Sequence, residues 1–409
     1  MLDIKYIREN SDKIKDGCRK KNVNCDIDLL LKLDKEHRKL LQEIEGLKAE
    51  QNKLGKEQQE EARALKNKIK EIEPELKKLW VEYNSLMKQV PNMPLEDVPV
   101  GKNESDNKIL RKEGKKPEFS FGPKDYLDIA ENLDIIDIKR ASKASGTRFG
   151  YIKGGAALLE FALIQFASNV LSKEGFIPII PPVMLTKNAM SAMGFLDKKS
   201  DTEEVYYLEK DDLYLIGTSE QSIGAMHIDE LFQEKELPKR YFGFSTCFRR
   251  EAGAYGKDTK GILRVHQFDK IEMFSFCKPE NSSEEHKLIL SIQEKLMKKL
   301  KLPYQVVHLS TGDISASSAS TYDIETWMPG QNQYRETHST SNCTDFQARR
   351  LNTRYKDKDE IKFVHTLNGT AFAIGRMLIA IIENCQQKDG SIKVPKVLRE
   401  YMNGIKKIS

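Results

Sequence analysis

Mostly hydrophobic residues recur at alternating steps of three and four along the N-terminal part of the chain, in two sets. The first set is Leu30, Leu33, His37, Leu40, Ile44, Leu47, Gln51 and Leu54, and the second is Leu65, Ile69, Ile72, Leu76, Leu79, Tyr83, Leu86 and Val90. This spacing places each set along one side of a helix, as in a coiled coil. Only the polar stretch KEQQEEARA separates the sets, so the pattern predicts an antiparallel helical hairpin over about residues 28–90. Pro74 falls on the solvent side, where we expect a local kink rather than a helix end.

Such a hairpin is typical of two different roles. A coiled coil can serve as a dimerisation or spacer element, or it can hold a partner. Between Leu30 and Val90 there are fourteen Lys or Arg and twelve Asp or Glu residues, so the hairpin is not a strongly basic surface that would by itself indicate nucleic acid. The pattern alone leaves both roles open.

The character of the chain changes after the hairpin. The stretch PNMPLEDVPVGKNESDNK is rich in proline, asparagine and charge and predicts a linker, so we expect one domain over residues 1–105 and another over residues 106–409. From about residue 117, strand-like segments are interrupted by few long helices. AALLEFALIQFASNVLSKEG predicts a helix ending at Gly175, and FIPIIPPVML an apolar strand broken by prolines. An antiparallel sheet flanked by helices, in the α+β class, fits better than a doubly wound parallel sheet.

Residues 248–274, FRREAGAYGKDTKGILRVHQFDKIEMF, combine many charges with aromatic residues in a predicted strand pair. Alternate residues of a strand share a face, and one face of the second strand would carry Arg264, His266, Phe268, Lys270, Glu272 and Phe274. We expect these charges to line a surface and not a core. Arginine binds phosphate or carboxylate and an aromatic ring stacks on a base. The segment therefore suggests a nucleotide site, the alternative being a surface hairpin with a ladder of salt bridges.

Three further stretches favour the nucleotide site. GTSE, residues 217–220, places a hydroxyl and a carboxylate at a predicted strand end, where they could hold an ammonium group. RETHS, residues 335–339, places Glu336 and Ser339 three residues apart, as oxygen ligands of a hard cation. LNGTAFAIGRMLIAIIEN, residues 367–384, is interpreted as a glycine-bearing turn before an apolar helix with a solitary Arg376, which would be costly without an anion. GTSE alone is more simply a turn, RETHS alone is a weak signal, and Arg376 alone could be an interface or capping arginine.

Composition excludes several classes of protein. The six cysteines form no C-x-x-C pair and do not stand at metal-binding spacing from the seven histidines, so neither a disulfide framework nor a zinc site is expected. A phosphate loop would need glycine where Glu251 stands, and neither G-x-S-x-G nor H-E-x-x-H occurs. His266 and His338 are interpreted as hydrogen-bonding strand residues and not as general bases. No window approaches the ~20 consecutive apolar residues of a membrane span. We expect a cytoplasmic protein that does not associate with a membrane.

The segment around Arg249, with GFIPIIPPVML before it and LNGTAFAIGRMLIAIIEN after it, resembles motifs 2, 1 and 3 of the class II aminoacyl-tRNA synthetases. Together with MLDIKYIREN, the helical hairpin, SGTRFGYIKGGAALLEFAL, GTSEQ, HQFDKIE, ETHSTSNCTDFQARR and DGSIKVPKVLREYM, the chain is similar nearly end to end to seryl-tRNA synthetases of the bacterial type. The resemblance implies a class II catalytic core with a tRNA-binding N-terminal coiled-coil arm. It also implies activation of L-serine with ATP and Mg²⁺ to seryl-adenylate, transfer of the seryl group to tRNA(Ser) and tRNA(Sec), and a homodimer.

The resemblance also assigns residues. It implies that serine is bound by Thr218, Ser219, Glu220, Arg249, Glu272 and Thr370. It implies that ATP is bound by Arg249, Arg250, Glu251, Arg264, Val265, Phe268, Glu336, Thr337, His338, Ser339 and Arg376. Phe268 would stack on adenine, and Glu336 and Ser339 would bind magnesium. The catalytic residues implied are Arg249, Lys270 and Arg376.

The chain departs from the family pattern at three places. Arg250 stands where serine is usual, Phe121 where histidine is common, and Thr370 with Ala371 replaces Ser-Gly, which keeps the hydroxyl but crowds the serine pocket. The sequence leaves two alternatives open. One is an armless relative that loads amino acids onto a carrier protein, against which the hairpin argues, and the other is a tRNA-binding paralogue that has lost activation, against which the intact charged residues argue.

Overall fold

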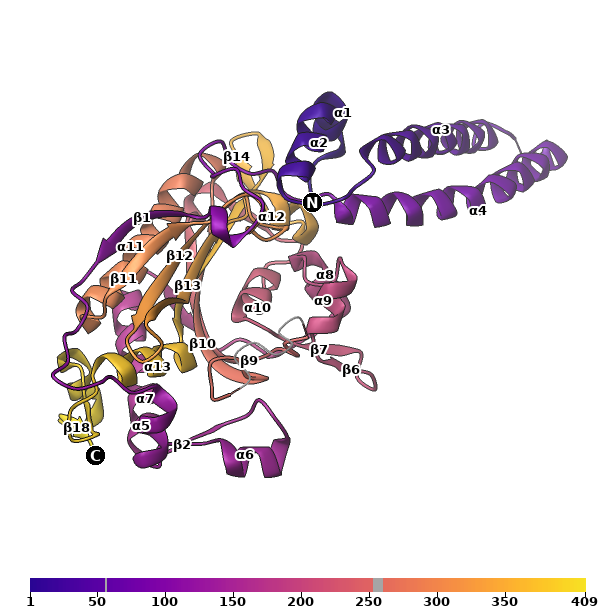
Figure 1. The fold of residues 1–409 in the computed structure, drawn as a ribbon. Helices are drawn as coiled ribbons and strands as arrows, with labels where there is room; N and C mark the ends of the chain where they lie inside the picture. The colour runs from indigo at the N-terminus through magenta and orange to yellow at the C-terminus, as the bar shows by residue number, and fades with distance from the viewer. Residues whose placement is uncertain (56, 253–259) are drawn as a thin grey trace. The chain divides into compact units, whose positions relative to one another are not determined.

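The computed structural model describes residues 1–55, 57–252 and 260–409 (Figure 1). The chain divides into two compact units, Met1–Met93 and Pro94–Ser409, and each is described by itself. The smaller unit is helical, and the larger one contains the main sheet.

The smaller unit consists of four helices: α1 Ile4–Glu9, α2 Ser11–Lys20, α3 Ile27–Gln51 and α4 Gln59–Gln89. Helices α3 and α4 form the predicted hairpin, whose seam residues are half-buried except for six that are buried: Leu30, Leu33, Ile44, Ile69, Tyr83 and Val90. Helix α4 continues through the exposed Pro74, as expected. It begins inside the stretch that was predicted to connect the helices. EEARA contains strong helix formers, which extend the helix without any seam residue.

The larger unit is built on an eight-stranded sheet in the order β1-β11-β12-β13-β16-β10-β9-β4. Its strands are β1 Lys108–Glu113, β11 Tyr304–His308, β12 Ser320–Met328, β13 Gln333–Asn342, β16 His365–Ala373, β10 Gln267–Cys277, β9 Lys239–Phe248 and β4 Ile177–Ile179. All neighbours are antiparallel except β4 and β9. The predicted antiparallel α+β class is confirmed.

Helices and small sheets surround this sheet. The helices are α5 Tyr126–Asn132, α6 Ile138–Ser145, α7 Gly154–Lys173, α8 Lys187–Met193, α9 Lys199–Glu204, α10 Ser219–Ala225, α11 Ser282–Leu300, α12 Phe346–Leu351 and α13 Ile374–Asn384. The short strands are β2 Ile136–Asp137, β3 Tyr151–Ile152, β5 Met184–Thr186, β6 Tyr207–Leu208, β7 Leu213–Leu215, β8 Leu231–Gln233, β14 Arg354–Asp357, β15 Glu360–Phe363, β17 Ile392–Lys393 and β18 Lys407–Ile408.

Strand β10 separates two packed regions. Ile271 and Met273 belong to a core shared with α7, α11 and α13, whereas Phe274 and Phe276 pack with residues of α8, α10 and α12. The prediction that the charged face of this strand lines a surface is wrong, because Lys270 and Glu272 are also buried. The strand begins at Gln267, so Arg264 and His266 precede it and were wrongly placed in it.

The segment LNGTAFA is another correction, because it forms the central strand β16 and not a turn. Its glycine is explained by packing: a Cβ at Gly369 would lie 2.4 Å from Cγ2 of Ile289 on α11. The glycine therefore permits close approach of the helix to the sheet. Helix α13 follows directly and carries Arg376 in its first turn.

Helix α7 is, among the described residues, the one helix long and apolar enough to cross a membrane by length and composition. Eight of its residues are buried, and several of them, including Leu163 and Phe166, lie in the same core as the sheet. A core helix of a folded domain passes the same test, so α7 is explained by packing.

Candidate active site

The end of β9, the start of β10, β13, β16 and α13 together enclose a cavity of about 170 Å³. Its lining residues are Arg249, Glu251, Ile262, Leu263, Val265, Phe268, Lys270, Glu336, Thr337, Ser339, Thr370, Ala373, Gly375 and Arg376. The sheet thus brings together most of the predicted ATP-binding residues, although they come from three distant parts of the chain.

A cluster of buried polar side chains lies directly beside this cavity. Thr218 caps the N-terminus of α10, and its hydroxyl accepts a hydrogen bond from Nζ of Lys270 at 3.1 Å. The same ammonium group pairs with Glu272. The hydroxyl of Thr370 donates to Oε2 of Glu272 at 3.2 Å from the neighbouring strand. Glu220, in the first turn of α10, completes the set.

The electrostatics of this cluster are dominated by two buried carboxyl groups. Burial raises the pKa of Glu220 to about 7, and the nearby Glu272 carboxylate adds to the increase. Burial also raises the pKa of Glu272, although the Lys270 ammonium acts in the opposite direction. Two carboxyl groups and two threonine hydroxyls around a single lysine form a site suited to a small ammonium compound that also carries a hydroxyl group.

Arg249 connects this polar cluster to the cavity. Its Nε donates to the carbonyl oxygen of Gly217 at 3.2 Å, and its guanidinium carbon lies 5.3 Å from the centre of the Phe268 ring. Glu251 follows with φ +51°. Its backbone N–H donates to Glu204 at 3.1 Å, and its carboxylate accepts from Arg264 at 3.4 Å. An arginine, an aromatic face and a carboxylate are thereby held along one wall.

The opposite wall is formed by β13 and α13. Nη1 of Arg376 donates to the backbone oxygen of Glu336 and pairs with its carboxylate, both at 2.9 Å. The surrounding protein atoms act to raise the pKa of Glu336, but Arg376 outweighs them and the pKa is lowered. Strands β12 and β13 change register between Ile324 and Glu325, with Thr337 as the extra residue. This bulge lets Glu336, Thr337 and Ser339 all line the cavity.

The oxygen atoms at this bulge fit a hard cation. Besides Glu336 and Ser339, Asp323 lies across the strand pair from Ser339, and its buried Oδ1 has no hydrogen-bond partner among the described residues. No three His, Cys, Asp or Glu side chains gather as a preformed metal site in the described part of the chain. The carboxylates of Glu336 and Asp323 and the hydroxyl of Ser339 form a donor set expected for Mg²⁺, which uses one or two carboxylates and takes its other ligands from water and phosphate.

Four predicted ligands belong neither to the cavity lining nor to the polar cluster beside it: Arg250, Arg264, Ser219 and His338. Of these, Arg264 donates to Glu251, as described above. Arg250 is exposed, with its guanidinium carbon 5.2 Å from the Tyr206 ring. Ser219 is buried and donates to the carbonyl oxygen of Gly243 at 3.2 Å. His338 is buried against Phe372 and lies 2.8 Å from the Thr337 hydroxyl, and burial lowers the pKa of the imidazole to about 3. As predicted, this histidine is a hydrogen-bonding residue, and so is His266, whose Nδ1 lies 3.0 Å from the carbonyl oxygen of Arg249.

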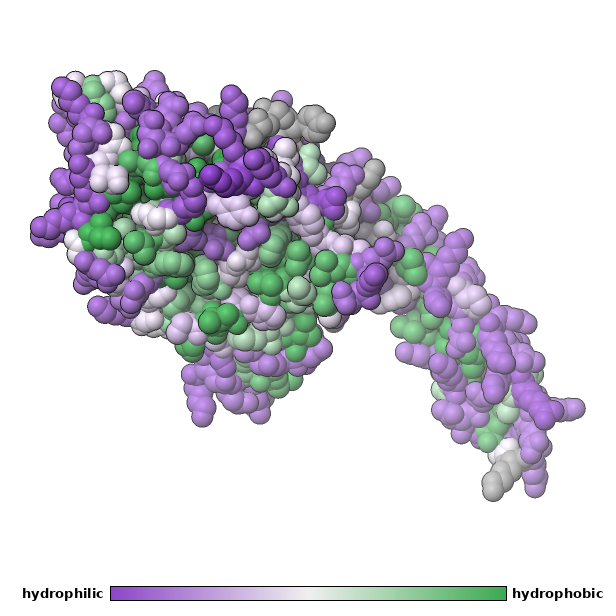
Figure 2. Space-filling model, turned by 90° about the horizontal axis from the view of Figure 1, so that it is seen from below, coloured by the Kyte–Doolittle hydropathy of each residue, from purple (hydrophilic) through white to green (hydrophobic). Residues whose placement is uncertain are grey.

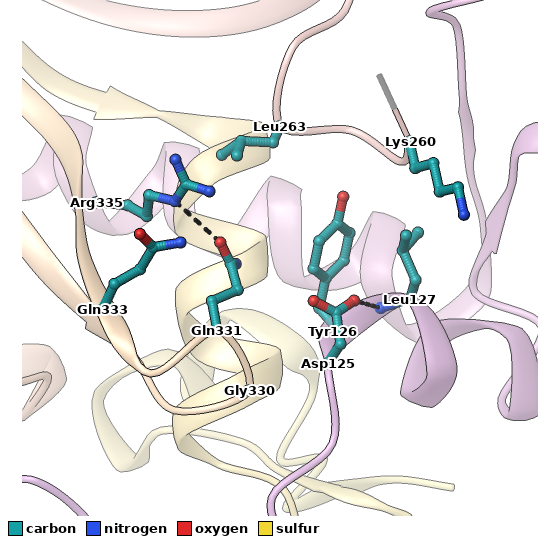
Figure 3. Close-up of a pocket in the computed structure, with 9 residues that line it drawn as sticks. All are labelled: Asp125, Tyr126, Leu127, Lys260, Leu263, Gly330, Gln331, Gln333 and Arg335. Carbon is teal, nitrogen blue, oxygen red and sulfur yellow. Dashed lines mark hydrogen bonds between the residues drawn. The ribbon is translucent and has the colours of Figure 1, made fainter. Parts of the chain in front are cut away.

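A second, larger hollow of about 550 Å³ adjoins the site (Figure 3). It shares Leu263 with the first cavity and carries two cationic side chains, Lys260 and Arg335. Arg335 donates to Gln331 at 3.0 Å, as the dashed line in Figure 3 shows. None of its lining residues was predicted as a ligand, and it contains none of the buried carboxyl groups. We therefore place the candidate active site in the smaller cavity.

Sequence reasoning missed the residues that support the site from behind. Gln347 and Asn368 both donate to Glu220, Glu204 holds the backbone beside Glu251, and Asp323 faces Ser339. Gln347 stands within a segment used for the family resemblance, but no local pattern distinguishes these polar residues from surface residues. Their burial depends on the tertiary fold.

Comparison with known proteins agrees with this geometry. Residues 1–94 match the family model of the seryl-tRNA synthetase N-terminal domain, and residues 204–385 match that of the class II tRNA synthetase core domain (G, H, P, S and T). The chain is 43% identical to the serine–tRNA ligase of Nitrosopumilus maritimus, with 100% of both chains covered. It is 44% identical to that of Dictyoglomus turgidum, covering 100% of this chain and 99% of the relative.

Solved structures give the same result. The crystal structure of seryl-tRNA synthetase from Pyrococcus horikoshii complexed with ATP has a TM-score of 0.92 and 40% identity, covering 100% of this chain and 99% of the other. The cytoplasmic serine–tRNA ligase from Naegleria fowleri in complex with AMP has a TM-score of 0.90 and 35% identity over the same shares.

Proposed function

Because the chain belongs to the seryl-tRNA synthetase family and is an ATP-dependent serine–tRNA ligase, we propose that it works in two steps at the cavity described above. L-Serine and ATP first form seryl-adenylate and pyrophosphate, and the seryl group then passes to the terminal ribose of tRNA(Ser) and also of tRNA(Sec) with release of AMP. The observation that carries this proposal is the buried polar cluster of Thr218, Glu220, Glu272 and Thr370 next to a cavity bounded by arginines.

Serine would bind in the polar cluster. The carboxylates of Glu220 and Glu272 and the hydroxyl of Thr218 suit its ammonium and hydroxyl groups, and Arg249 suits its carboxylate. Lys270 now pairs with Glu272 and Thr218, so serine must displace or share these contacts. Alanine would leave a buried acceptor unpaired, which is worth ~10⁴-fold where a site is built around a hydroxyl. Threonine would be excluded by the shape of the pocket, in which Thr370 lies, whereas Ala371 belongs to the hydrophobic core.

ATP would bind in the 170 Å³ cavity. Adenine would stack on Phe268 with its amine on Glu251, and Arg249, Arg264 and Arg376 would hold the phosphates. Glu336 and Ser339 would hold Mg²⁺, which when bound neutralises phosphate charge. The serine carboxylate attacks the α-phosphorus in line, the bond from this phosphorus to the bridging oxygen breaks, and pyrophosphate leaves, so no enzyme group is covalently modified. The arginines and Lys270 stabilise the negative charge that develops on the phosphates.

The helical hairpin and the edge of the sheet would supply the macromolecular contacts. We assign the tRNA to the α3–α4 arm, residues 28–90, within the proposed domain 1–105, and the chemistry to residues 106–409. A homodimer is supported by the apolar edge strand β4, which among the described strands pairs with β9 alone. Near it Ile180 is 91% exposed and Phe161 on α7 64% exposed, and hydrophobic residues gather on the face of the larger unit in Figure 2. We also propose a cytoplasmic location, and the packing of α7 in the core of the larger unit agrees with a helix that does not span a membrane.

Pyrophosphate exchange with each amino acid in turn tests the proposal. Exchange that depends on serine, together with charging of serine tRNA, is the expected result. Exchange with another amino acid, or serine activation followed by loading of a carrier protein, would contradict it, as would tRNA binding without any exchange. Sedimentation of the protein as a monomer at micromolar concentration would contradict the dimer.

A further inference from the structure

The carboxyl group of Glu220 is held from behind by two amide side chains. Its Oε1 accepts one hydrogen bond from Nε2 of Gln347 and another from Nδ2 of Asn368, each at 3.0 Å. Gln347 comes from α12 and Asn368 from β16, while Glu220 lies on α10. All three side chains are buried, and Gln347 has no exposed surface at all. This is an ordered polar network in the interior of the larger unit.

The orientation of the Gln347 amide is fixed by a further hydrogen bond. Thr366 donates its hydroxyl proton to Oε1 of Gln347 at 2.7 Å. Because the oxygen end of the amide is occupied in this way, the nitrogen end must point toward Glu220. Thr366 is itself fully buried on β16. The sheet therefore determines the direction of the amide, and the amide determines the position of the carboxylate oxygen.

Two donors on Oε1 leave Oε2 as the oxygen of Glu220 that can interact with a ligand or carry a proton. We propose that Gln347 is a positioning residue for serine recognition: it anchors Oε1 of Glu220 so that Oε2 is presented to the ammonium group of serine. The inference rests on the proposed function, since it deepens the role given to Glu220. Gln347 does not line the proposed ATP cavity. Its hydrogen-bond partners Met193, Glu220 and Thr366 are not among the predicted catalytic residues.

The charges around Glu220 give this network a second effect. Burial and Glu272 raise the pKa of Glu220, whereas the hydrogen bond from Gln347 and the charges of Lys270 and Arg249 lower it. A buried carboxylate depends strongly on each donor it retains. Loss of the Gln347 amide would therefore move the pKa of Glu220 upward and reduce the fraction that is ionised at neutral pH.

The test is Gln347→Met, which removes the amide while keeping the length of the side chain. A hydrogen bond to a charged group contributes enough that its loss should raise the KM for serine by about tenfold or more in pyrophosphate exchange. The KM for ATP should stay within about twofold, since no ATP contact changes. The acid limb of kcat/KM for serine should also move to higher pH.

Gln386→Met is the matched control, because Gln386 is an equally buried glutamine that bonds to the backbone of Lys124 and Glu383, away from Glu220. It should lower the melting temperature without changing the KM for serine. Thr366→Val removes only the group that orients the amide, and should shift the KM and the acid limb in the same direction by a smaller factor. It decides the matter if Gln347→Met does not fold.

An unchanged KM and acid limb in Gln347→Met, or equal losses of serine and ATP affinity in it, would overturn the inference. If Gln347→Met does not fold, unchanged values in Thr366→Val would do the same. Failure of the proposed function would look different, because the unmodified protein itself would then show no serine-dependent exchange.

Discussion

The proposed serine pocket and the helical arm use charge in opposite ways. In the pocket, Glu220, Glu272 and Lys270 are buried and each one bonds to other protein groups. Along the arm, residues 30–90 carry fourteen Lys or Arg and twelve Asp or Glu, most of them exposed. A buried charge is costly unless its partners are fixed in advance, whereas an exposed charge costs little and contributes little.

This difference predicts how each region responds to change. Pocket residues form a network, so a single substitution should have a large effect confined to serine. Arm residues act as a large, dispersed surface, so removal of the whole arm should have a large effect on tRNA, whereas the loss of one residue should have a small effect. The experiments below separate these two behaviours.

The largest expected effect comes from replacing residues 28–90 with a short Gly/Ser linker. Every residue assigned to adenylate formation lies in the larger unit, which has its own core. Serine-dependent pyrophosphate exchange should therefore stay within a few-fold of the intact protein, and the dimer should persist. Charging of tRNA should fall by orders of magnitude, because the phosphate and sugar contacts proposed for the arm would be lost.

Two results would contradict this expectation. If charging of tRNA is unchanged, the coiled coil is a spacer and does not bind tRNA. Loss of exchange would show that the arm supports the catalytic unit, and a melting curve of the shortened protein would then show a destabilised core.

Glu272→Gln should give the next largest effect. The substitution keeps the shape and removes the charge from a group that is 1% exposed and bonded to Thr370 and Lys270. Loss of a charge-assisted hydrogen bond to serine corresponds to a rise of about 10- to 100-fold in the KM for serine. The KM for ATP should remain nearly constant in the same exchange assay. Equal losses for the two substrates would show that Glu272 is not a serine ligand.

The two regions also differ in how far sequence could predict them. Periodicity identified the seam of the arm, including Leu33 and Ile69, because a helical hairpin buries only the hydrophobic stripe between its two helices. It placed the start of α4 too late, since helix propensity alone extends that helix to Gln59. In the pocket, alternation correctly grouped Phe268, Lys270 and Glu272 on one face.

Alternation could not say that this face is covered. Lys270 and Glu272 are buried because α10 and the strands on both sides of β10 pack around them, which is a property of the tertiary fold. The same holds for Gln347 and Asn368, whose shared partner Glu220 lies more than a hundred residues away in the chain. The roles of individual site residues came from family resemblance, and they stay proposals until they are tested.

The pH dependence of the pocket should be moderate in size. The pKa of Glu220 is about 7 in the folded protein, raised by burial and by Glu272, so the carboxylate becomes protonated below neutral pH. If ionised Glu220 binds the serine ammonium group, kcat/KM for serine should fall by about tenfold for each pH unit below about 7. Because Lys270 and Arg249 face the same group, the midpoint belongs to the cluster as a whole.

Glu220→Gln tests the raised pKa of Glu220 through the pH dependence of stability. A folded pKa above the unfolded value means that the stability contribution of Glu220 is fully present below the unfolded pKa and is lost as pH rises toward about 7. Glutamine does not ionise. The melting temperature of the variant minus that of the unmodified protein should therefore be larger at pH 8 than at pH 5. An equal difference at both pH values would contradict the raised pKa.

The smallest expected effect belongs to single arm residues. Lys39 is exposed on α3 and forms no ion pair with any residue that the structure describes, so its removal leaves no unpaired carboxylate. Lys39→Ala should leave pyrophosphate exchange unchanged and weaken tRNA binding by about two- to threefold, as expected for one exposed phosphate contact. If Lys39 neutralises one phosphate of a duplex, the slope of log K against log salt should become shallower by about 0.9. Glu36→Ala, three residues earlier on the same helix, should leave tRNA affinity equal or slightly higher. A loss of tRNA binding in Lys39→Ala as large as that caused by removing the arm would mean that the arm, like the serine pocket, depends on individual fixed charges, and the contrast between the two regions would not hold.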